Sequence, residues 1–426
     1  MLYQEVEILN KEDLLKYFDQ DKDLLLDICK NLIKIPSENP GGDSLAISKY
    51  IKDLLEEHGI EVEVHKSADK MINLIAKIGK DDGKNLIYCG HSDTVPVGDR
   101  SKWEFDPFEG EIVDGILRGR GASDMKCGLG GLIFSLIYLK KHNIDINGSL
   151  TLAVVPDEET GTDFGVPYLF ENKLLKGDGA LIAEPSGDLN PTIGQKGSGA
   201  FTLTVYGEPG HGSLAPLSGK SAIENAILAI NKLREYTDKK IEVPEELKKL
   251  IEVSKQYVVE KEVNGEKLAQ IFERCSFNLG VIKGGTARNV IADKCVVEID
   301  SRLPFGIERD KFLKDVKDIL NSLDIEYDFE ESGFKSNANY TPAEDPVCKY
   351  TVDNISYVKN QKAYGVLQWA CSDARYFRQN NIPVLQYGPA ILETIHGFNE
   401  RAEVQDIVDC AKVYILTAVD FLNEDK

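Results

Sequence analysis

Apolar and polar residues follow two different periods along this chain, one helical and one typical of strands. Helical spacing covers residues 11–34 and 44–58, and a Gly-rich apolar stretch at 127–142 predicts a helix packed closely on a flat surface. Apolar runs of strand length occupy residues 61–65, 73–78, 85–91, 149–156 and 179–185. Because these strands alternate with helices, we expect an α/β fold with a mixed, largely parallel sheet flanked by helices.

The pattern changes near residue 196 and returns after residue 334. In between, strand-like and helical segments follow one another at 199–206, 218–236, 275–282, 293–301, 308–322 and 324–330. Their β-α-β-β-α-β order is that of a ferredoxin-like α+β domain. We therefore expect a larger α/β domain formed by residues 1–195 and 334–426, interrupted by an inserted domain at 196–333.

Charge and cysteine usage narrow the class of protein. The net charge of −21 argues against nucleic acid or an anionic membrane as a partner, since both require clustered Lys and Arg. The eight cysteines include no CxxC pair and several lie inside apolar runs, which indicates reduced thiols. The N-terminus lacks the basic start and apolar core of a signal peptide, and we expect no transmembrane helix. These features favour a cytoplasmic protein.

Histidine and acidic residues stand at the ends of the predicted strands or in Gly-rich turns. The set comprises His91, Asp124, Glu158, Glu159, Glu184 and His396. Because ligand sites of open α/β sheets lie beyond the carboxyl ends of the strands, we expect these side chains to converge there. Two imidazoles with several carboxylates form a donor set that suits divalent cations such as Zn²⁺. The sequence therefore predicts a metal-dependent hydrolase.

The motifs around these residues carry a family resemblance. In chain order they are H-S-D-T-V-P, G-R-G-A-S-D-M-K, D-E-E-T-G, A-E-P, G-H-G-S, G-G-T-A-R-N-V-I and H-G-F-N-E. Together they resemble the M20 metallopeptidase and deacylase family, which includes acetylornithine deacetylase, succinyl-diaminopimelate desuccinylase, aminoacylase and glutamate carboxypeptidase. The similarity covers nearly the whole chain. It implies a catalytic α/β domain bearing two metals, and an inserted lid through which two copies form a homodimer.

Carried over position by position, the resemblance implies a set of ligands for each of the two metals. One metal would be held by His91 and Glu184, and the other by Glu159 and His396, with Asp124 bridging the two. Zn²⁺ is the expected ion, with Co²⁺ as the alternative. In the family the peptide bond after the bridging aspartate, here Asp124–Met125, is often cis.

The resemblance also implies catalytic roles. Asp93 would accept the second ring N–H of His91 and so fix its tautomer. Glu158 would be the general base, taking a proton from metal-activated water and passing it to the leaving amine. His211 would reach over from the lid, in the family that of the partner subunit, to stabilise the oxyanion.

The resemblance also implies substrate-binding residues, and the chain departs from the family pattern in two places. Arg375, in S-D-A-R, would bind a substrate carboxylate, because a planar guanidinium pairs bidentately with one. Asn289 matches a lid position that contacts substrate, and Arg302 is a further candidate. Cys127 stands where the family usually has glycine, at a helix start expected to lower its pKa, so it is either a packing substitution or a thiol sensitive to oxidation. The segment 237–272 is longer than a minimal lid needs, and its charge runs at 237–262 predict a solvated helix face.

The expected reaction is cleavage of an N-acyl amide bond in an N-acylated amino acid, as in deacylases for acetylornithine or succinyl-diaminopimelate. A carboxypeptidase or dipeptidase acting on peptide bonds next to a free carboxylate is the alternative within the family. An alternative of another class is a catalytically silent metal-binding or scaffold protein. The first two use the same chemistry and differ in what the lid and pocket hold, so the sequence leaves both open.

Overall fold

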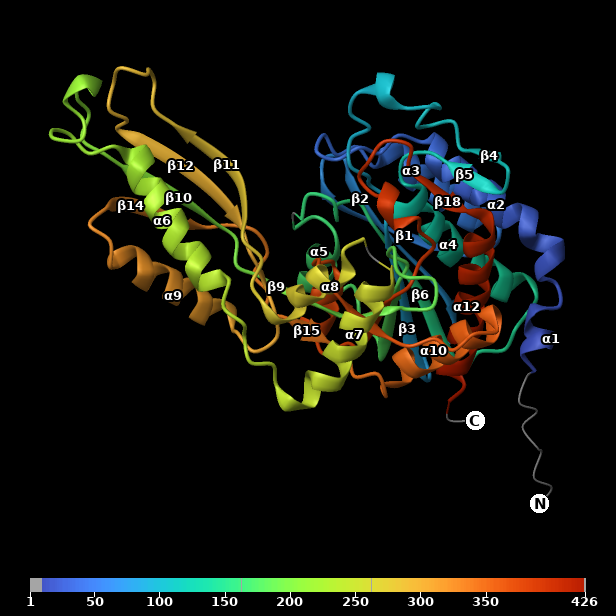
Figure 1. Cartoon of the computed structure of the whole chain (residues 1–426). Helices are drawn as coiled ribbons and strands as arrows, with labels where there is room; N and C mark the ends of the chain where they lie inside the picture. The colour runs from blue at the N-terminus through green and yellow to red at the C-terminus, as the bar shows by residue number, and fades with distance from the viewer. Residues whose placement is uncertain (1–9, 162, 262, 425–426) are drawn as a thin grey trace. The chain divides into compact units, whose positions relative to one another are not determined.

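A computed structural model describes residues 10–161, 163–261 and 263–424 of the chain (Figure 1). The chain divides into two compact units. The first runs to Ile193 and continues over Thr341–Gly365 and from Ser372 onward, whereas the second comprises Gly194–Tyr340 and Val366–Cys371. The second unit is thus seven residues longer at its end than the expected 196–333 insertion, and it gains a separate short segment.

The first unit is built on a mixed sheet whose middle strands are parallel. Its strands lie in the spatial order β1 (Val62–Ala68), β2 (Met71–Gly79), β6 (Gly148–Val155), β3 (Lys84–His91), β7 (Gly179–Ile182) and β17 (Val384–Gln386). The pairs from β6 to β17 are parallel, and those between β1, β2 and β6 are antiparallel. β3, β6 and β7 are almost wholly buried because their residues are continuously apolar, as predicted.

Helices supply the rest of this core. They are α1 (Lys11–Leu15), α2 (Phe18–Lys34), α3 (Leu45–Glu57), α4 (Cys127–Lys141), α5 (Val166–Glu171), α10 (Pro346–Lys359), α11 (Ala374–Gln379) and α12 (Val404–Leu422). α4 is buried along nearly its whole length and packs against α2, α12 and β3. Gly128 has no room for a side chain, since a Cβ there would lie 2.2 Å from the carbonyl oxygen of Ala183. The glycines of α4 therefore permit the close packing on the sheet that the sequence predicts.

One stretch of this unit is long and apolar enough for a membrane span. By length and composition Ala122–Lys141, which includes α4, could cross a bilayer. However, 94% of its most apolar window is buried inside the protein. A helix that is apolar all round is also what the core of a large α/β domain requires.

A small three-stranded sheet in the first unit brings two distant loops together. Its strands are β4 (Glu111–Val113), β5 (Ile116–Arg118) and β18 (Arg401–Glu403). β18 pairs antiparallel with β5, with Arg401 opposite Arg118. The residues just before β18 and just after β5 consequently lie side by side.

The second unit contains the β-α-β-β-α-β order that the sequence predicts. Its four-stranded antiparallel sheet has the order β11 (Asn278–Gly284), β12 (Lys294–Asp300), β10 (Phe201–Tyr206) and β14 (Glu326–Glu331). The helices α6 (Ala222–Thr237) and α9 (Arg309–Asn321) lie side by side along the strands (Figure 1). Apolar residues from both helices and from the strands form one core. This unit is therefore a two-layer structure with a single covered face.

Short elements complete the second unit. They are β9 (Gly197–Ser198), α7 (Lys248–Lys261), α8 (Gly265–Leu268), β13 (Arg302–Leu303), β15 (Asn339–Tyr340) and β16 (Val366–Gln368), while β8 (Thr192–Gln195) crosses the division between the units. α7 and α8 form half of the long segment 237–272. α7 packs on β16, and the Ser254 hydroxyl accepts the backbone N–H of Leu367 at 2.9 Å. One face of α7 is therefore packed, and most of its charged residues lie exposed on the other face, as its charge runs predict.

Candidate metal centre

Three neighbouring strands of the first unit deliver side chains to one point. His91 is the last residue of β3, Glu158 and Glu159 follow β6, and Glu184 follows β7. Because β6, β3 and β7 are parallel neighbours, their carboxyl ends meet at the same edge of the sheet. Asp124 comes from the turn before α4 and lies in an extended conformation, with φ −126° and ψ 97°. The peptide bond Asp124–Met125 is cis, as the family resemblance implies.

The donor atoms around His91 are close together. The Nε2 atom of His91 lies 3.1 Å from Oδ1 of Asp124 and 3.7 Å from Oε1 of Glu184. His91, Glu158 and Glu184 form a group whose ligand atoms lie within 4.8 Å of one another, and so do His91, Asp124 and Glu159. Glu158 is therefore itself near enough to reach a cation held by His91 and Glu184.

His396 approaches the same cluster from the opposite side of Asp124. Its Nε2 atom lies 3.3 Å from Oδ2 of Asp124 and 3.0 Å from Oε2 of Glu159. Asp124 thus presents one carboxylate oxygen to each imidazole, which is the geometry of a bridging ligand. His91 is buried whereas the side chain of His396 is half exposed, so the cluster opens to solvent on the His396 side.

The residues fit a pair of divalent cations. The Oε1 atom of Glu159 is buried and has no hydrogen-bond partner among the described residues. A buried carboxylate oxygen without a partner is costly, and a metal ion would satisfy it. Three carboxylates and two imidazoles with borderline-soft nitrogen donors are suited to Zn²⁺ or Co²⁺. The side chains that converge here are those named from the sequence, and their role as metal ligands stays a prediction.

The protein strongly perturbs these groups. Burial raises the pKa of Glu184 to about 8, with the nearby Asp124 and Glu159 adding to the rise. Burial, with the neighbouring Glu184, also raises the pKa of Glu158 well above its ordinary value. Hydrogen bonds to Asp124 and Glu159 raise the pKa of His396 to about 10. Without a cation, the cluster therefore holds protons that a metal would displace.

Asp93 does more than orient the imidazole. The Nδ1 atom of His91 lies 3.0 Å from the backbone carbonyl oxygen of Asp93, closer than the 3.4 Å to its carboxylate. The carboxylate instead accepts the backbone N–H groups of Glu158 and Glu159, both at 3.2 Å. It also accepts the side-chain amide of Asn39 at 3.0 Å. One residue therefore holds the loop that carries two acidic groups of the site, a role that the sequence does not suggest.

The S-D-A-R segment lies at the edge of the centre through its aspartate. Asp373 is buried and its charge contributes to the raised pKa of Glu158. Burial raises the pKa of Asp373 itself to about 6, although the positive charge of Arg375 opposes the rise. The guanidinium of Arg375 is 2% exposed and donates to the Ser372 carbonyl at 2.6 Å and the Tyr376 hydroxyl at 2.9 Å. Substrate binding by Arg375 stays a prediction.

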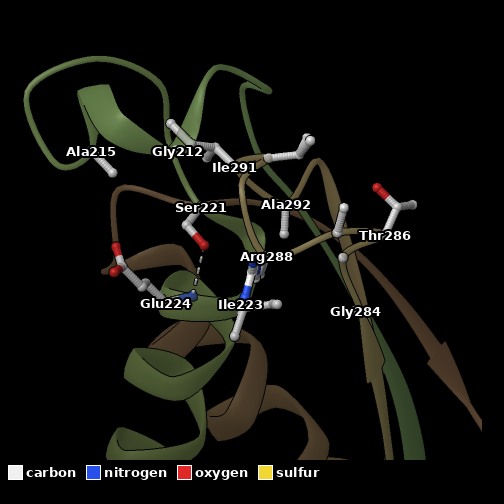
Figure 2. A pocket seen from close by; sticks show the side chains of 13 residues that line it. Gly212, Ala215, Ser221, Ile223, Glu224, Gly284, Thr286, Arg288, Ile291 and Ala292 are labelled. Atoms are coloured by element: carbon white, nitrogen blue, oxygen red, sulfur yellow. Dashed lines mark hydrogen bonds between the residues drawn. The ribbon is translucent and has the colours of Figure 1, made fainter.

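Two of the predicted lid residues lie together in the second unit. The backbone N–H of Gly212 donates to the Asn289 carbonyl at 2.8 Å, and His211 is bridged to Val290. His211 is exposed, and its Nδ1 lies 2.7 Å from the Ser213 hydroxyl. Next to this pair is a pocket of about 570 Å³ between the start of α6 and the loop after β11 (Figure 2). Its lining includes Arg288 and Glu224, which supply opposite charges.

The third predicted lid residue, Arg302, lies elsewhere in the second unit. It is partly buried, its Nε donates to Asp300 at 3.1 Å, and its guanidinium stacks on Phe334. The roles of His211, Asn289 and Arg302 toward a substrate stay predictions.

Cys127 is not the activated thiol that its position at a helix start suggests. It is buried, and burial together with the adjacent thiol of Cys29 raises its pKa well above the ordinary value. Desolvation outweighs the helix dipole here, because no water reaches the sulfur. The cysteine is a packing residue beside α2. All eight cysteines are free thiols, as expected.

Comparison with known proteins identifies the family. A model of peptidase family M20/M25/M40 matches residues 87–420. The chain belongs to this family. The match spans every residue of the centre from His91 to His396, so the arrangement described above is that of an M20 hydrolase. The family is metal-dependent, and this chain has a cluster of candidate metal-binding residues.

Individual relatives differ in their named activities. Succinyl-diaminopimelate desuccinylase of Wolbachia pipientis wMel is 28% identical over 396 residues, which cover 91% of each chain. Among solved structures, an M20 family metallo-carboxypeptidase from Sulfolobus solfataricus has a TM-score of 0.78 at 20% identity, covering 94% of this chain and 99% of that one. Human carnosine dipeptidase 1 has a TM-score of 0.75 at 16% identity, with 97% and 99% covered. These two structural likenesses concern the M20 fold alone.

Proposed function

We propose that this M20 hydrolase cleaves the amide bond of an N-acylated amino acid, as a deacylase. The convergence of His91, Asp124, Glu159, Glu184 and His396 at one sheet edge supports amide hydrolysis. The 28% identity to a desuccinylase over nearly the full length of both chains supports the deacylase branch.

We infer that two cations, Zn²⁺ or Co²⁺, are held at this centre. His91 and Glu184 would hold one, Glu159 and His396 the other, and Asp124 both. Such ions would act as Lewis acids on the scissile carbonyl and on water. The protein contributes fixed ligands, because Asp93 ties the 158–159 loop to the end of β3.

Glu158 is the proposed general base. It adjoins the cluster yet is not needed to complete either cation's ligand set. From there its carboxylate would take a proton from water and return it to the leaving nitrogen. His211 would donate a hydrogen bond to the developing oxyanion, and Arg375, with Asn289 and Arg302, would hold the substrate's free carboxylate.

A peptidase that cleaves next to a free carboxylate is the second candidate. The observation in its favour is that the matching family model describes peptidases, peptidase family M20/M25/M40. A panel of N-acetyl- and N-succinyl-amino acids beside dipeptides, assayed with Zn²⁺- and Co²⁺-loaded protein, separates the two. Cleavage of dipeptides alone would contradict the deacylase proposal, and a metal-loaded protein that cleaves nothing would favour the silent scaffold.

We further propose that two copies pair through the second unit. The strand β11 pairs only with β12 among the described strands, and Ile282 on it is exposed. Ile227 and Leu228 are exposed on α6. If two α6 helices crossed antiparallel at Leu228, Glu224 of each would face Lys232 of the other, which makes the surface self-complementary.

The oligomeric state tests this pairing. Leu228→Asp should convert a dimer into a monomer in analytical ultracentrifugation, because it places two carboxylates at the twofold axis. Val64→Asp, at an exposed apolar residue of the first unit, is the matched control and should leave the dimer intact. A monomeric wild type would refute the proposal. The free thiols lead us to propose the cytoplasm as the site of action.

A further inference from the structure

A buried ion pair outside the ligand set joins the two loops that carry Asp124 and His396. Glu400 is 1% exposed, and its Oε2 accepts Nη1 of Arg120 at 2.6 Å. Arg120 is 2% exposed. Removing two charges from water is unfavourable unless the geometry and further hydrogen bonds compensate. The remaining hydrogen bonds of both side chains go to the backbone around the metal centre, and the Arg120 guanidinium lies over the Trp103 ring, 5.1 Å from its centroid.

Glu400 holds the turn of the bridging ligand. Its Oε1 accepts the backbone N–H groups of Ser123 at 3.0 Å and of Asp124 at 2.9 Å. Its Oε2 accepts the N–H of Gly121 at 3.1 Å. Both carboxylate oxygens are thereby occupied, so the turn from Gly121 to Asp124 has one allowed position relative to Glu400.

Arg120 holds the other loop. Its Nη2 donates to the carbonyl of Gly397 at 2.9 Å, directly after His396, and to that of Pro96 at 3.3 Å. His396 has a φ of +59°, a left-handed conformation that a residue with a Cβ adopts only where its surroundings enforce it. Arg120 supplies such an enforcing contact on the peptide that follows.

We propose that Arg120 and Glu400 form a positioning pair that sets the affinity of the cation position between Asp124, Glu159 and His396. This inference rests on the proposed two-cation function. Neither residue touches a cation or the substrate; the pair acts by keeping the imidazole of His396 at the right distance from Asp124. The ligands of the other cation, His91 and Glu184, lie at the ends of β3 and β7. The Arg120–Glu400 pair should therefore affect the affinity for that cation less.

The test titrates metal-free protein with Co²⁺, followed by calorimetry and by visible absorption. Wild type should bind two equivalents. Glu400→Gln and Arg120→Lys should each weaken one equivalent by about 10–100-fold and leave the other near the wild-type affinity. The equivalent that remains should have the absorption spectrum of cobalt bound to His396→Ala, which keeps only the His91 position.

Several outcomes would overturn the positioning role of Arg120 and Glu400. Two unchanged equivalents, equal weakening of both, or a residual spectrum matching that of His91→Ala would each refute it. Arg309→Lys is the control, because Arg309 is also a buried arginine and its Nη2 lies 3.0 Å from Oε2 of the more exposed Glu331 in the second unit. Should Glu400→Gln fail to fold, Arg120→Lys retains the charge and answers the same question. If wild type binds no cobalt, the proposed function itself fails.

Discussion

The metal centre and the His211 loop are two regions built in opposite ways. The centre is made largely of buried side chains, and the carboxylates of Asp93 and Glu400 accept backbone N–H groups of the segments that carry them. The His211 loop is exposed and held mainly by backbone bonds to the Asn289 loop. The proposed metal binding and proton transfer therefore lie on a preformed scaffold, whereas the proposed oxyanion donor lies on a surface loop.

The largest expected effect comes from the centre. Glu158→Gln should lower kcat by about 10²–10⁴-fold, because it removes proton transfer while keeping the shape of the side chain. Bound metal, measured by elemental analysis after dialysis, should stay at the wild-type level. Loss of one metal would instead make Glu158 a ligand, which its place in the His91–Glu184 group also allows.

The next effect comes from the exposed loop. His211→Ala should lower kcat by about 10²–10³-fold with unchanged metal content, as expected for loss of a single oxyanion donor. Gly210→Ala, a neighbour without a titratable side chain, is the control for disturbance of the loop. A drop in bound metal would place His211 in the ligand set and erase the contrast between the two regions.

Mixing two inactive variants sharpens the same contrast. If His211 acts on the partner subunit, Glu158→Gln and His211→Ala proteins should regain activity when their subunits are exchanged, since a mixed dimer contains one intact site. No recovery, although mass spectrometry shows mixed dimers, would mean that His211 acts within its own chain.

The sequence predicts the residues of the metal centre better than it predicts the residues that hold them in place. His91, Glu159 and Glu184 follow apolar runs, so strand ends alone bring them to one edge. Nothing in local pattern says that Glu400 turns inward to the Asp124 turn, since this depends on the pairing of β18 with β5 across nearly 300 residues of sequence. Likewise, the position of Cys127 suggested an activated thiol, because burial by α2 cannot be inferred from a helix start.

A smaller effect tests whether the centre is truly preformed. Asp93→Asn should weaken metal binding by about 10–100-fold, because an amide offers one acceptor oxygen to donors that two oxygens now satisfy. Competition with a fluorescent chelator measures this affinity. Asp157→Asn changes a buried aspartate in the same loop that bonds Thr160 and Asn39 instead, and should have less effect. Equal losses of metal affinity in the two variants would mean that any buried charge in this loop supports the metal centre to the same extent.

The smallest effect concerns stability in the second unit. Lys196 is buried, its Nζ donates to the carbonyls of Ile271 and Arg274 at 2.8 Å each, and burial lowers its pKa from 10.5 to about 7. Between pH 7 and pH 10.5 Lys196 binds a proton more readily in the unfolded chain than in the folded one. The unfavourable contribution of Lys196 to the free energy of folding therefore decreases as pH rises. The urea midpoint of wild type, relative to Lys196→Met, should therefore increase from pH 7 to pH 10.

Comparison between variants isolates this lysine, because thiols and tyrosines that titrate over the same range are common to both proteins. Lys267→Met, at an exposed position, is the control and should follow wild type at every pH. A difference between wild type and Lys196→Met that is constant with pH would mean that Lys196 keeps its ordinary proton affinity. The second unit would then contain no perturbed charge at this position, and the metal centre would differ from it in electrostatics as well as in burial.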